Sequence, residues 1–230
     1  MGPYEAVHAH PAGQTTAARF AKTAAEYGFD GVIVRTREAE YDAESLSDTY
    51  GVDVVRGIEI EAPDPQAASG AIGNHRAECT VLSVRGGTPE LNRFAAEQDR
   101  VDVLSRPFRG DGDVNHVIVK EAVAHDVRIE FDFGPVLRRD GGERVRYLRK
   151  LRKLRELVAY YDAPYVVSAT PRSHLELRAR RELSAVAETV GFEDGAVEDG
   201  LSEWGRLAAR NRERRSEAFI SPGVKRGRTE

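Results

Sequence analysis

The sequence predicts a seven-stranded (β/α) barrel of the TIM-like kind, followed by a C-terminal helical extension. Seven short runs of alternating or β-branched residues are separated by segments with helical periodicity. This alternation indicates parallel β-α units with right-handed crossovers, and continued round it closes into a barrel. No glycine-rich phosphate loop follows the first strand, which argues against a dinucleotide-binding sheet. The 230 residues are enough for one such core.

Helix ends in the first half of the chain are marked by residues with clear conformational preferences. Gly28 and Gly51 follow helical segments and favour the left-handed conformation in which helices often end. Thr88 has the hydroxyl of a helix N-cap, and Pro89 fits a first helical position. With the β-branched runs between them, the predicted order is strand 4–10, helix 14–27, strand 31–35, helix 37–50, strand 52–61, helix 66–76, strand 79–85 and helix 88–98.

The second half repeats the alternation and ends in helices. Residues 143–161 have apolar side chains every three or four positions, which predicts the longest helix. Gly191 is placed to end the next helix. The predicted order is strand 101–105, helix 115–125, strand 127–133, helix 143–161, strand 165–168, helix 172–190, a loose acidic link at 195–200, helix 201–218 and a basic tail at 219–230.

This order also predicts the domain organisation. Residues 1–197 are expected to form the barrel domain. Residues 198–230 are expected to form a C-terminal helix and a basic tail, packed on the barrel or extending from it.

Composition excludes several classes of protein. Cys79 is the only cysteine, so the chain has neither an internal disulfide nor a cysteine-built zinc site. No apolar run approaches the length of roughly 18 residues that a membrane span needs. The N-terminus lacks the basic-then-apolar pattern of a secretory signal. We therefore expect a cytoplasmic protein with no membrane partner.

Charge is unevenly distributed along the chain. The net charge is −4, yet residues 138–155 hold nine basic residues against two acidic ones. Of the 34 basic residues, 5 are lysine and 29 are arginine. Acidic excess with arginine in place of lysine resembles the composition of salt-adapted proteins. Because counterion release contributes less at high salt, a nucleic-acid binder from such a cell need not be basic overall.

Polar side chains gather at the predicted strand ends. His8 and His10 alternate onto one face of the first strand, and Glu59 lies near the end of the third. In α/β folds, the carboxyl ends of strands carry the chemistry. Two imidazoles and several carboxylates could hold zinc or manganese and activate water for phosphoester hydrolysis. The alternative is a buried network of paired ions that closes the lumen.

Residues 127–133 extend this pattern. Charged and apolar side chains alternate along the run, so the two sets point to opposite faces of the strand. The apolar set is expected to pack against the helices. The lumen would then receive the charged set, Arg128, Glu130 and Asp132.

Three ordered motifs resemble those of the polymerase-and-histidinol-phosphatase (PHP) superfamily of seven-stranded barrels, whose enzymes hold a metal cluster at the barrel mouth. They are His8-Ala-His10-Pro11, Gly57-Ile58-Glu59-Ile60 and Ser105-Arg106-Pro107-Phe108.

Two departures from the superfamily argue against a metal cluster. Arg106 stands where the superfamily has a histidine, and residues 165–174 (YVVSATPRSH) lack its Asp-x-His. Because a cation in a ligand position repels a metal, we expect the cluster to be lost. His8 and His10, in contrast, are residues that could bind a metal, so the hydrolase alternative remains open.

Along nearly its whole length the chain resembles a metal-free branch of this fold, the archaeal and eukaryotic ribonuclease P protein component 3 family. The order of the matching stretches along the chain carries the resemblance. The stretches that carry the resemblance are residues 4–10, 27–34, 57–60, 101–105, 129–131 and 166–169.

This resemblance implies a function at the level of a complex. Ribonuclease P removes the 5′ leader from precursor tRNA, and in this family the RNA subunit carries out the cleavage. The resemblance implies ribonuclease P RNA, precursor tRNA within the complex and protein component 2 as partners, the two proteins forming a heterotetramer. It implies no catalytic residue, metal or cofactor in this chain.

Two sets of basic residues are candidates for RNA contact. Residues 143–161 combine one apolar stripe with a cationic remainder, and arginine can hold phosphate with paired donors. Taken alone, such a helix is more often a solvated face; the resemblance favours RNA binding. The helix candidates are Arg144, Arg146, Arg149, Lys150, Arg152 and Lys153, and the strand-end candidates are Arg106, Arg109 and Arg172.

Two other interpretations remain open at this point. One is a metal-dependent phosphoesterase that uses His8, His10, Glu59 and one further carboxylate. The other is an inert barrel that binds only protein partners. Trp204, Tyr160 and Tyr161 are interpreted as packing residues rather than as platforms for RNA bases.

Overall fold

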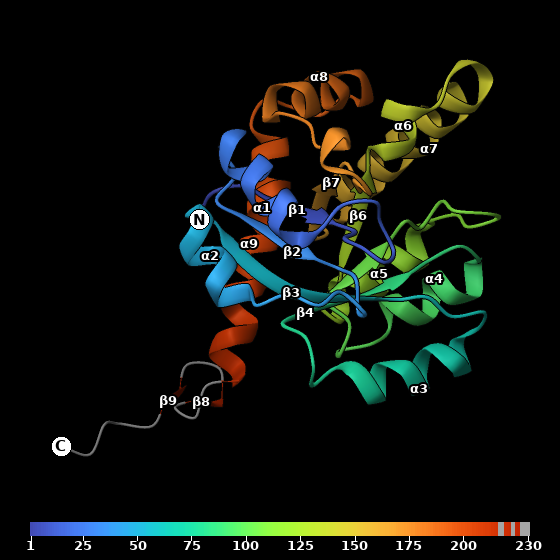
Figure 1. The fold of residues 1–230 in the computed structure, drawn as a ribbon. Helices are drawn as coiled ribbons and strands as arrows, with labels where there is room; N and C mark the ends of the chain where they lie inside the picture. Colours follow the sequence, from blue (N-terminus) through green and yellow to red (C-terminus); the bar gives the residue numbers. More distant parts are fainter. Residues whose placement is uncertain (216–218, 222–223, 226–230) are drawn as a thin grey trace.

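The computed structural model describes residues 1–215, 219–221 and 224–225. Seven parallel strands are hydrogen-bonded in their sequence order and curve into a nearly closed barrel (Figure 1), which confirms the predicted fold class. The strands are β1 Tyr4–Val7, β2 Gly31–Val34, β3 Asp53–Ile60, β4 Val81–Arg85, β5 Val103–Ser105, β6 Arg128–Asp132 and β7 Tyr165–Ser168.

Side chains and loop backbone join β1 to β7. The buried carboxylate of Glu5 in β1 accepts hydrogen bonds from the Ser168 hydroxyl (2.6 Å) and from the Ala169 N–H (3.1 Å). Just past both strands, the His8 N–H donates to the Pro171 carbonyl (2.9 Å). These contacts bring the carboxyl ends of the first and last strands together at one mouth of the barrel.

Helices cover the outside of the barrel, and buried apolar side chains fill the layer between them and the strands. Thr88 caps its helix as predicted, its hydroxyl accepting a hydrogen bond from the Leu91 N–H (3.2 Å). The helices are α1 Ala17–Glu26, α2 Ala43–Tyr50, α3 Pro65–His75, α4 Pro89–Ala96, α5 His116–Ala124, α6 Gly134–Arg138, α7 Gly141–Tyr161, the 3₁₀-helix η1 His174–Glu176, α8 Arg180–Val190 and α9 Ala196–Arg215.

The structure corrects the predicted elements around β7 and α9. The helix predicted at 172–190 is interrupted: η1 ends at Glu176, and α8 begins at Arg180. Between them, Leu177 has extended backbone and is 1% exposed, so its burial in the core outweighs local helical periodicity. The predicted loose link at 195–200 is also wrong, because α9 already begins at Ala196.

Other differences are smaller. The short helix α6 follows β6 and was not predicted from the sequence. The helix predicted at 37–50 begins only at Ala43, because the Asp42 side chain caps it by accepting from the Ser45 N–H (3.1 Å). Of the tail predicted at 219–230, the structure describes two paired strands, β8 Phe219–Ser221 and β9 Val224–Lys225. The rest of that tail and residues 216–218 of the predicted last helix lie outside the described residues.

Helix α9 forms part of the barrel interior. Its buried side chains Trp204 and Leu207 join a second apolar cluster with inward-facing residues from the early part of the strands. The Trp204 indole N–H donates to the Val167 carbonyl of β7 (2.9 Å). The helix crosses the predicted domain boundary at 197/198, and the division into two domains stays a prediction. Within the described residues, no helix is long and apolar enough to cross a membrane.

Close approach of α9 to the strands depends on two glycines. A Cβ at Gly205 would lie 2.6 Å from the Tyr4 ring, and a Cβ at Gly200 would lie 2.6 Å from the Val167 side chain. Any larger residue would force α9 away from β1 and β7 and lift Trp204 out of the lumen.

Replacing Trp204 by alanine is expected to lower the free energy of unfolding by roughly 3–5 kcal/mol, because the change leaves a cavity in the barrel and removes a buried hydrogen bond. Urea unfolding followed by circular dichroism measures this loss. The control is Tyr160→Ala, since Tyr160 is 80% exposed and its loss should cost less than about 0.5 kcal/mol. Equal stability of the two variants would contradict the interior role of α9.

Candidate functional site

The carboxyl ends of β1, β3 and β5 bring three predicted site residues together. His8 Nε2 lies 3.1 Å from Glu59 Oε2, and Nη2 of Arg106 lies 3.1 and 3.2 Å from the two ring nitrogens of His8. A donor nearly equidistant from both nitrogens cannot lie in the ring plane without meeting the carbon between them. The Arg106 guanidinium therefore lies over the face of the His8 ring.

Glu59 is the centre of a buried ionic network. Its side chain is 1% exposed, and Oε2 accepts from Arg85 Nη2 (2.6 Å) as well as contacting His8. Its other oxygen accepts from the Ser105 hydroxyl (2.8 Å) and lies 3.5 Å from Arg35 Nη1. All the acceptor capacity of this carboxylate is thus directed at protein donors.

Arg35 and Glu130 carry the network deeper into the lumen. Both side chains are fully buried, and Arg35 Nη1 donates to Glu130 Oε1 (2.8 Å). The Arg35 guanidinium also lies 5.4 Å from the centre of the Trp204 ring, which is a cation–π contact. Trp204 belongs to α9, whose buried side chains plug this end of the lumen.

The predicted division of β6 holds. Glu130 lies in the lumen, Asp132 lines the cavity at its mouth, and Arg128 pairs with Glu203 of α9 (2.8 Å) at the end of the lumen that α9 occupies. The apolar side chains of β6 pack in the layer under the helices.

Protonation follows from this geometry. Burial lowers the pKa of His8 to about 3, so the imidazole is neutral at pH 7 and contacts Glu59 as a hydrogen-bond partner rather than as a cation. Burial alone would raise the pKa of Glu59, but the hydrogen bond from His8 and the guanidinium groups of Arg106 and Arg35 outweigh it and hold that pKa well below its usual range.

The donor set does not fit a metal cluster. The positively charged Arg106 guanidinium lies against His8, where a metal would bind. The oxygens of Glu59 accept hydrogen bonds from Arg85 and from the Ser105 hydroxyl. His10 is exposed and does not join the network. Among the described residues, no group of three histidine, cysteine, aspartate or glutamate side chains could hold a metal ion. The arrangement is that of a buried ionic network that closes the lumen.

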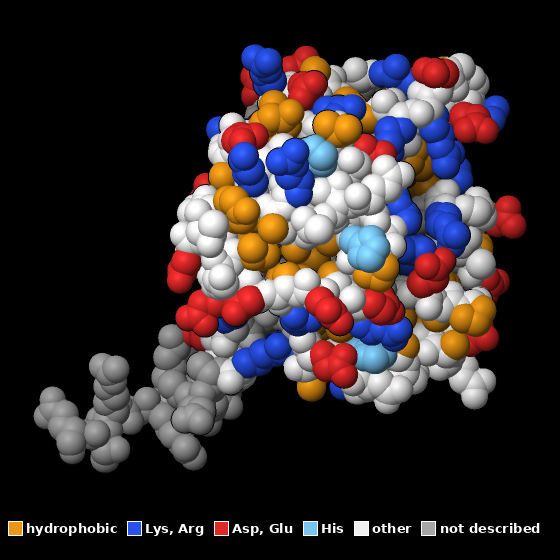
Figure 2. All heavy atoms as spheres, viewed as in Figure 1, with side chains coloured by type: hydrophobic (Ala, Val, Ile, Leu, Met, Phe, Trp, Pro, Cys, Tyr) orange, Lys and Arg blue, Asp and Glu red, His pale blue; other side chains and the backbone are white. Residues whose placement is uncertain are grey.

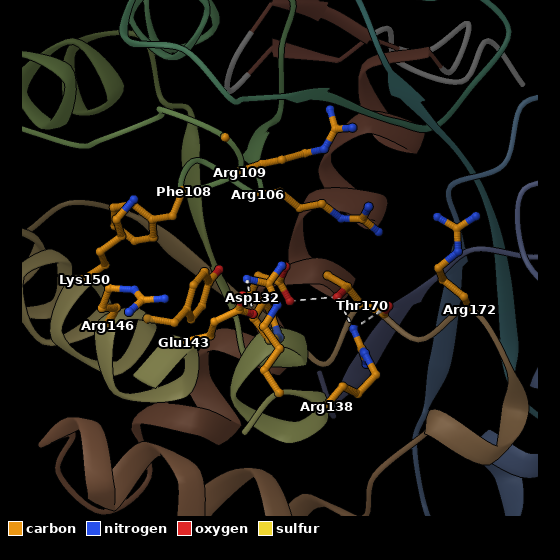
Figure 3. Close-up of a pocket in the computed structure, with 14 residues that line it drawn as sticks. Arg106, Phe108, Arg109, Asp132, Arg138, Glu143, Arg146, Lys150, Thr170 and Arg172 are labelled. Atoms are coloured by element: carbon orange, nitrogen blue, oxygen red, sulfur yellow. Dashed lines mark hydrogen bonds and ion pairs between the residues drawn. The ribbon is translucent and has the colours of Figure 1, made fainter. Parts of the chain in front are cut away.

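A cavity of about 490 Å³ lies at the same mouth, next to this network (Figure 3). Its lining comes from the end of β5, the end of β6, α6, α7 and the loop after β7. Seven of the lining residues are cationic and two are acidic. The cations are Arg106, Arg109, Arg138, Arg139, Arg146, Lys150 and Arg172, and the acids are Asp132 and Glu143.

The three predicted strand-end residues all line this cavity, but differ in exposure. Arg106 lies at the base of the cavity, and its side chain is 15% exposed. Arg109 is 59% exposed and lies 3.4 Å from Glu61. Arg172 is exposed at the rim, and its guanidinium donates to the Ala12 carbonyl.

The basic helix α7 borders the cavity and presents most of its predicted residues to solvent. Lys150 is half-buried and donates to the Gly112 carbonyl (3.2 Å), while Lys153 pairs with Asp113 (2.8 Å). In Figure 2, lysine and arginine side chains gather at the upper right of the molecule, where Figure 1 places α6 and α7. The exposed members of the predicted set are Arg144, Arg146, Arg149, Arg152 and Lys153.

Three residues of this site were not predicted from the sequence. Arg138, Arg139 and Thr170 line the cavity, and the two arginines belong to the basic segment that the charge count had marked. They were not assigned because α6, which carries Arg138 into the mouth, was not predicted. The packing interpretation is confirmed for buried Trp204 but wrong for Tyr160, which is 80% exposed. The apolar stripe predicted along residues 143–161 included Val145, but Val145 is 48% exposed and Tyr147 is buried instead.

A family model described as RNase P subunit p30 matches residues 4–216. The chain belongs to the RNase P subunit p30 family. Ribonuclease P protein component 3 of Halorubrum lacusprofundi is 58% identical, over 99% of this chain and 98% of the relative. The same component of Haloarcula marismortui is 56% identical, over 96% of each chain.

Solved structures agree with the p30-family fold. A chain in the cryo-EM structure of archaeal ribonuclease P with mature tRNA superposes with a TM-score of 0.81 at 21% identity, covering 99% of both chains. A histidinol phosphate phosphatase from Lactococcus lactis, with zinc, L-histidinol and phosphate, has a TM-score of 0.52 at 10% identity, covering 83% of this chain and 94% of the phosphatase. Membership of the p30 family favours the subunit interpretation over the phosphoesterase alternative.

Replacing Glu59 by glutamine is expected to lower the free energy of unfolding by roughly 3 kcal/mol or more, because Arg35 and Arg85 would lose the charge that compensates them in a buried site. The control is Glu61→Gln, whose side chain is 56% exposed and whose ion pairs should contribute less than about 1 kcal/mol. Chemical unfolding of both variants makes the comparison. Similar losses would show that Glu59 is not the centre of the network.

The pH dependence of stability tests the buried Glu130. Burial, with the charges of Asp132 and Glu59, raises the pKa of Glu130 to about 7, although Arg35 opposes the shift. A raised carboxyl pKa contributes stability that is fully present below the unfolded value of about 4.5 and is lost as pH rises through about 7. Glu130→Gln lacks this loss, so its stability relative to wild type should rise by up to roughly 1.4 kcal/mol per pH unit across that interval and then level off.

Urea unfolding at several pH values between about 5 and 8 measures the difference. Glu143→Gln is the control, because the Glu143 side chain is 61% exposed and its variant should follow the wild-type profile. A pH-independent difference between Glu130→Gln and wild type would contradict the raised pKa.

Proposed function

We propose that this chain is a protein subunit of ribonuclease P that supports RNA-catalysed removal of the 5′ leader from precursor tRNA. The match to the RNase P subunit p30 family over residues 4–216 carries this proposal. The chain would act by binding the RNA subunit, with precursor tRNA bound within the complex, and by pairing with protein component 2 in a heterotetramer. In this arrangement its own residues position RNA and do not perform the cleavage.

The mouth network supports a role without catalysis by this chain. A general base or metal ligand needs a free acceptor directed at the substrate. Glu59 directs its oxygens at Arg85, Ser105 and His8 instead. Hydrolysis by the strand-end histidines would require both imidazoles in one place, whereas His8 is buried and His10 is exposed.

The arginine surface supports RNA binding. Guanidinium groups form paired hydrogen bonds with phosphate oxygens, and backbone contacts of this kind position a protein on RNA without reading its sequence. Exposed Arg144, Arg149 and Arg152 lie on α7, beside the arginine-lined mouth. The negative net charge does not oppose this proposal, because a local cationic surface is sufficient for phosphate contact.

RNA binding by α7 can be tested by replacing Arg144, Arg149 and Arg152 together with glutamine. At fixed salt, the Kd for ribonuclease P RNA should rise at least about tenfold, and the slope of log K against log salt should fall by roughly 2 to 3 as phosphate contacts are lost. Filter binding over a KCl series, with the component 2 partner present, measures both quantities.

The matched control replaces Arg19, Arg93 and Arg181, exposed arginines on three other helices, and changes the net charge equally. Equal effects of the two triple variants would mean that only net charge matters. Unchanged RNA affinity in the α7 variant would favour the barrel that binds only protein. Phosphoester hydrolysis by the RNA-free protein with zinc or manganese, abolished by His8→Ala, would contradict the proposal.

A further inference from the structure

Two residues that line the base of the mouth cavity have strained backbone. Arg106 and Thr170 both lie at its lining, and both have left-handed backbone, each with φ of 46°. Among the described non-glycine residues, two others have positive φ, Asp126 and Asp162, and these follow the ends of α5 and α7, where left-handed residues are common. A threonine in this conformation is a genuine outlier, because its branched Cβ crowds the backbone.

Two carboxylates of β6 hold these strained residues in place. Glu130 Oε2 accepts from the Arg106 N–H (3.0 Å), and Asp132 Oδ1 accepts from the Thr170 hydroxyl (2.7 Å). Strained backbone persists only where its surroundings over-determine it, and it concentrates at functional sites. Glu130 and Asp132 are therefore positioning residues for the cavity base.

One donor at the base of the cavity has no hydrogen-bond acceptor. Arg106 Nε is buried without a hydrogen-bond partner in the described structure: its nearest ionic neighbour, Glu59 Oε1, is 3.9 Å away, and the Nη2 arm of its guanidinium lies over His8. Arg138 donates to the Ala169 carbonyl (2.9 Å) and to the Thr170 hydroxyl (3.1 Å), which fixes its guanidinium at the cavity wall (Figure 3). Buried polar groups without partners mark places where a ligand or water completes the hydrogen bonding.

The chemistry of the lining selects the ligand. Seven cations against two acids repel a metal ion and attract an anion. One guanidinium fork satisfies a planar carboxylate, whereas a phosphate has enough acceptor oxygens to engage guanidinium groups from several directions. Here such groups come from the end of β5, from α6, from α7 and from the loop after β7. The cavity volume of about 490 Å³ is within the range of small-ligand sites.

We propose that the mouth cavity is a discrete binding site for one phosphate group of RNA, with Arg106, Arg138 and Arg172 as its main ligands. This inference rests on the proposed function and adds to it a defined site distinct from the exposed face of α7. The phosphate has two possible sources in RNA, an internal phosphodiester or a 5′-terminal monophosphate. The same donors suit both, and RNA end chemistry separates them.

The first experiment uses inorganic phosphate and the full chain without RNA. At constant ionic strength in chloride, added phosphate should raise the Tm of the wild-type protein, because a ligand that binds only the folded state stabilises it. The double variant Arg138→Gln/Arg172→Gln should lose at least half of this shift. The control Arg93→Gln/Arg181→Gln, with the same charge change, should keep it. Both pairs are at the surface, so folding is expected to survive.

The second experiment measures binding of ribonuclease P substrate RNA with a 5′-phosphate and with a 5′-hydroxyl. A terminal source predicts that wild type binds the phosphorylated RNA at least fivefold more tightly and that the double variant loses this preference. An internal source predicts equal binding of both RNAs and an equal loss, at least fivefold, in the double variant. Either result supports the site.

The site is refuted if phosphate shifts the Tm of the double variant and of its control equally and the double variant binds both RNAs as wild type does. Weakened binding of the component 2 partner with unchanged RNA and phosphate binding would assign the cavity to an acidic protein segment and also overturn the proposal. Failure of the proposed function is distinguishable, because then the wild-type protein would not bind RNA in either form.

Discussion

The buried contacts of Arg35 with Glu59 and Glu130 are the constraint on which the rest of this barrel depends. These charges lie in the lumen, where an unpaired ion would cost several kcal/mol. Below them, the Arg35 guanidinium meets the Trp204 ring of α9, and above them Glu59 engages Arg85. The lumen is thus ordered from an apolar plug, through an ionic layer, to the arginine-lined mouth.

This layering explains how a barrel with the fold of metal hydrolases can have a mouth that does not form a metal site. A histidine and a glutamate remain at the strand ends, but the neutral His8 ring lies between Glu59 and Arg106. The positive charge that a metal would supply is carried by guanidinium groups. Because arginine keeps its charge and paired donors at every physiological pH, the mouth carries a permanent excess of positive charge.

Backbone strain and close helix packing lie at opposite ends of the barrel. Arg106 and Thr170 adopt left-handed backbone at the mouth, and carboxylates of β6 hold them. The opposite end of the lumen is filled by α9, whose two glycines let the helix approach β1 and β7 closely. The two ends of the lumen therefore differ: α9 fills one, and the other keeps open volume and an unpaired buried donor, Arg106 Nε.

The sequence by itself determined the seven-fold alternation, the caps such as Thr88 and the candidates His8, Glu59 and Arg106, because local periodicity and residue chemistry are written in short segments. Only the tertiary structure decided that His10 points away, that Tyr160 is exposed and that α6 brings Arg138 to the mouth. It also interrupted the helix expected at 172–190, which is a 3₁₀-helix at His174–Glu176 and an α-helix from Arg180, with extended backbone at buried Leu177 between them. These outcomes depend on which distant side chains share one volume, and a contact between residues far apart in the chain leaves no periodic signal in either segment.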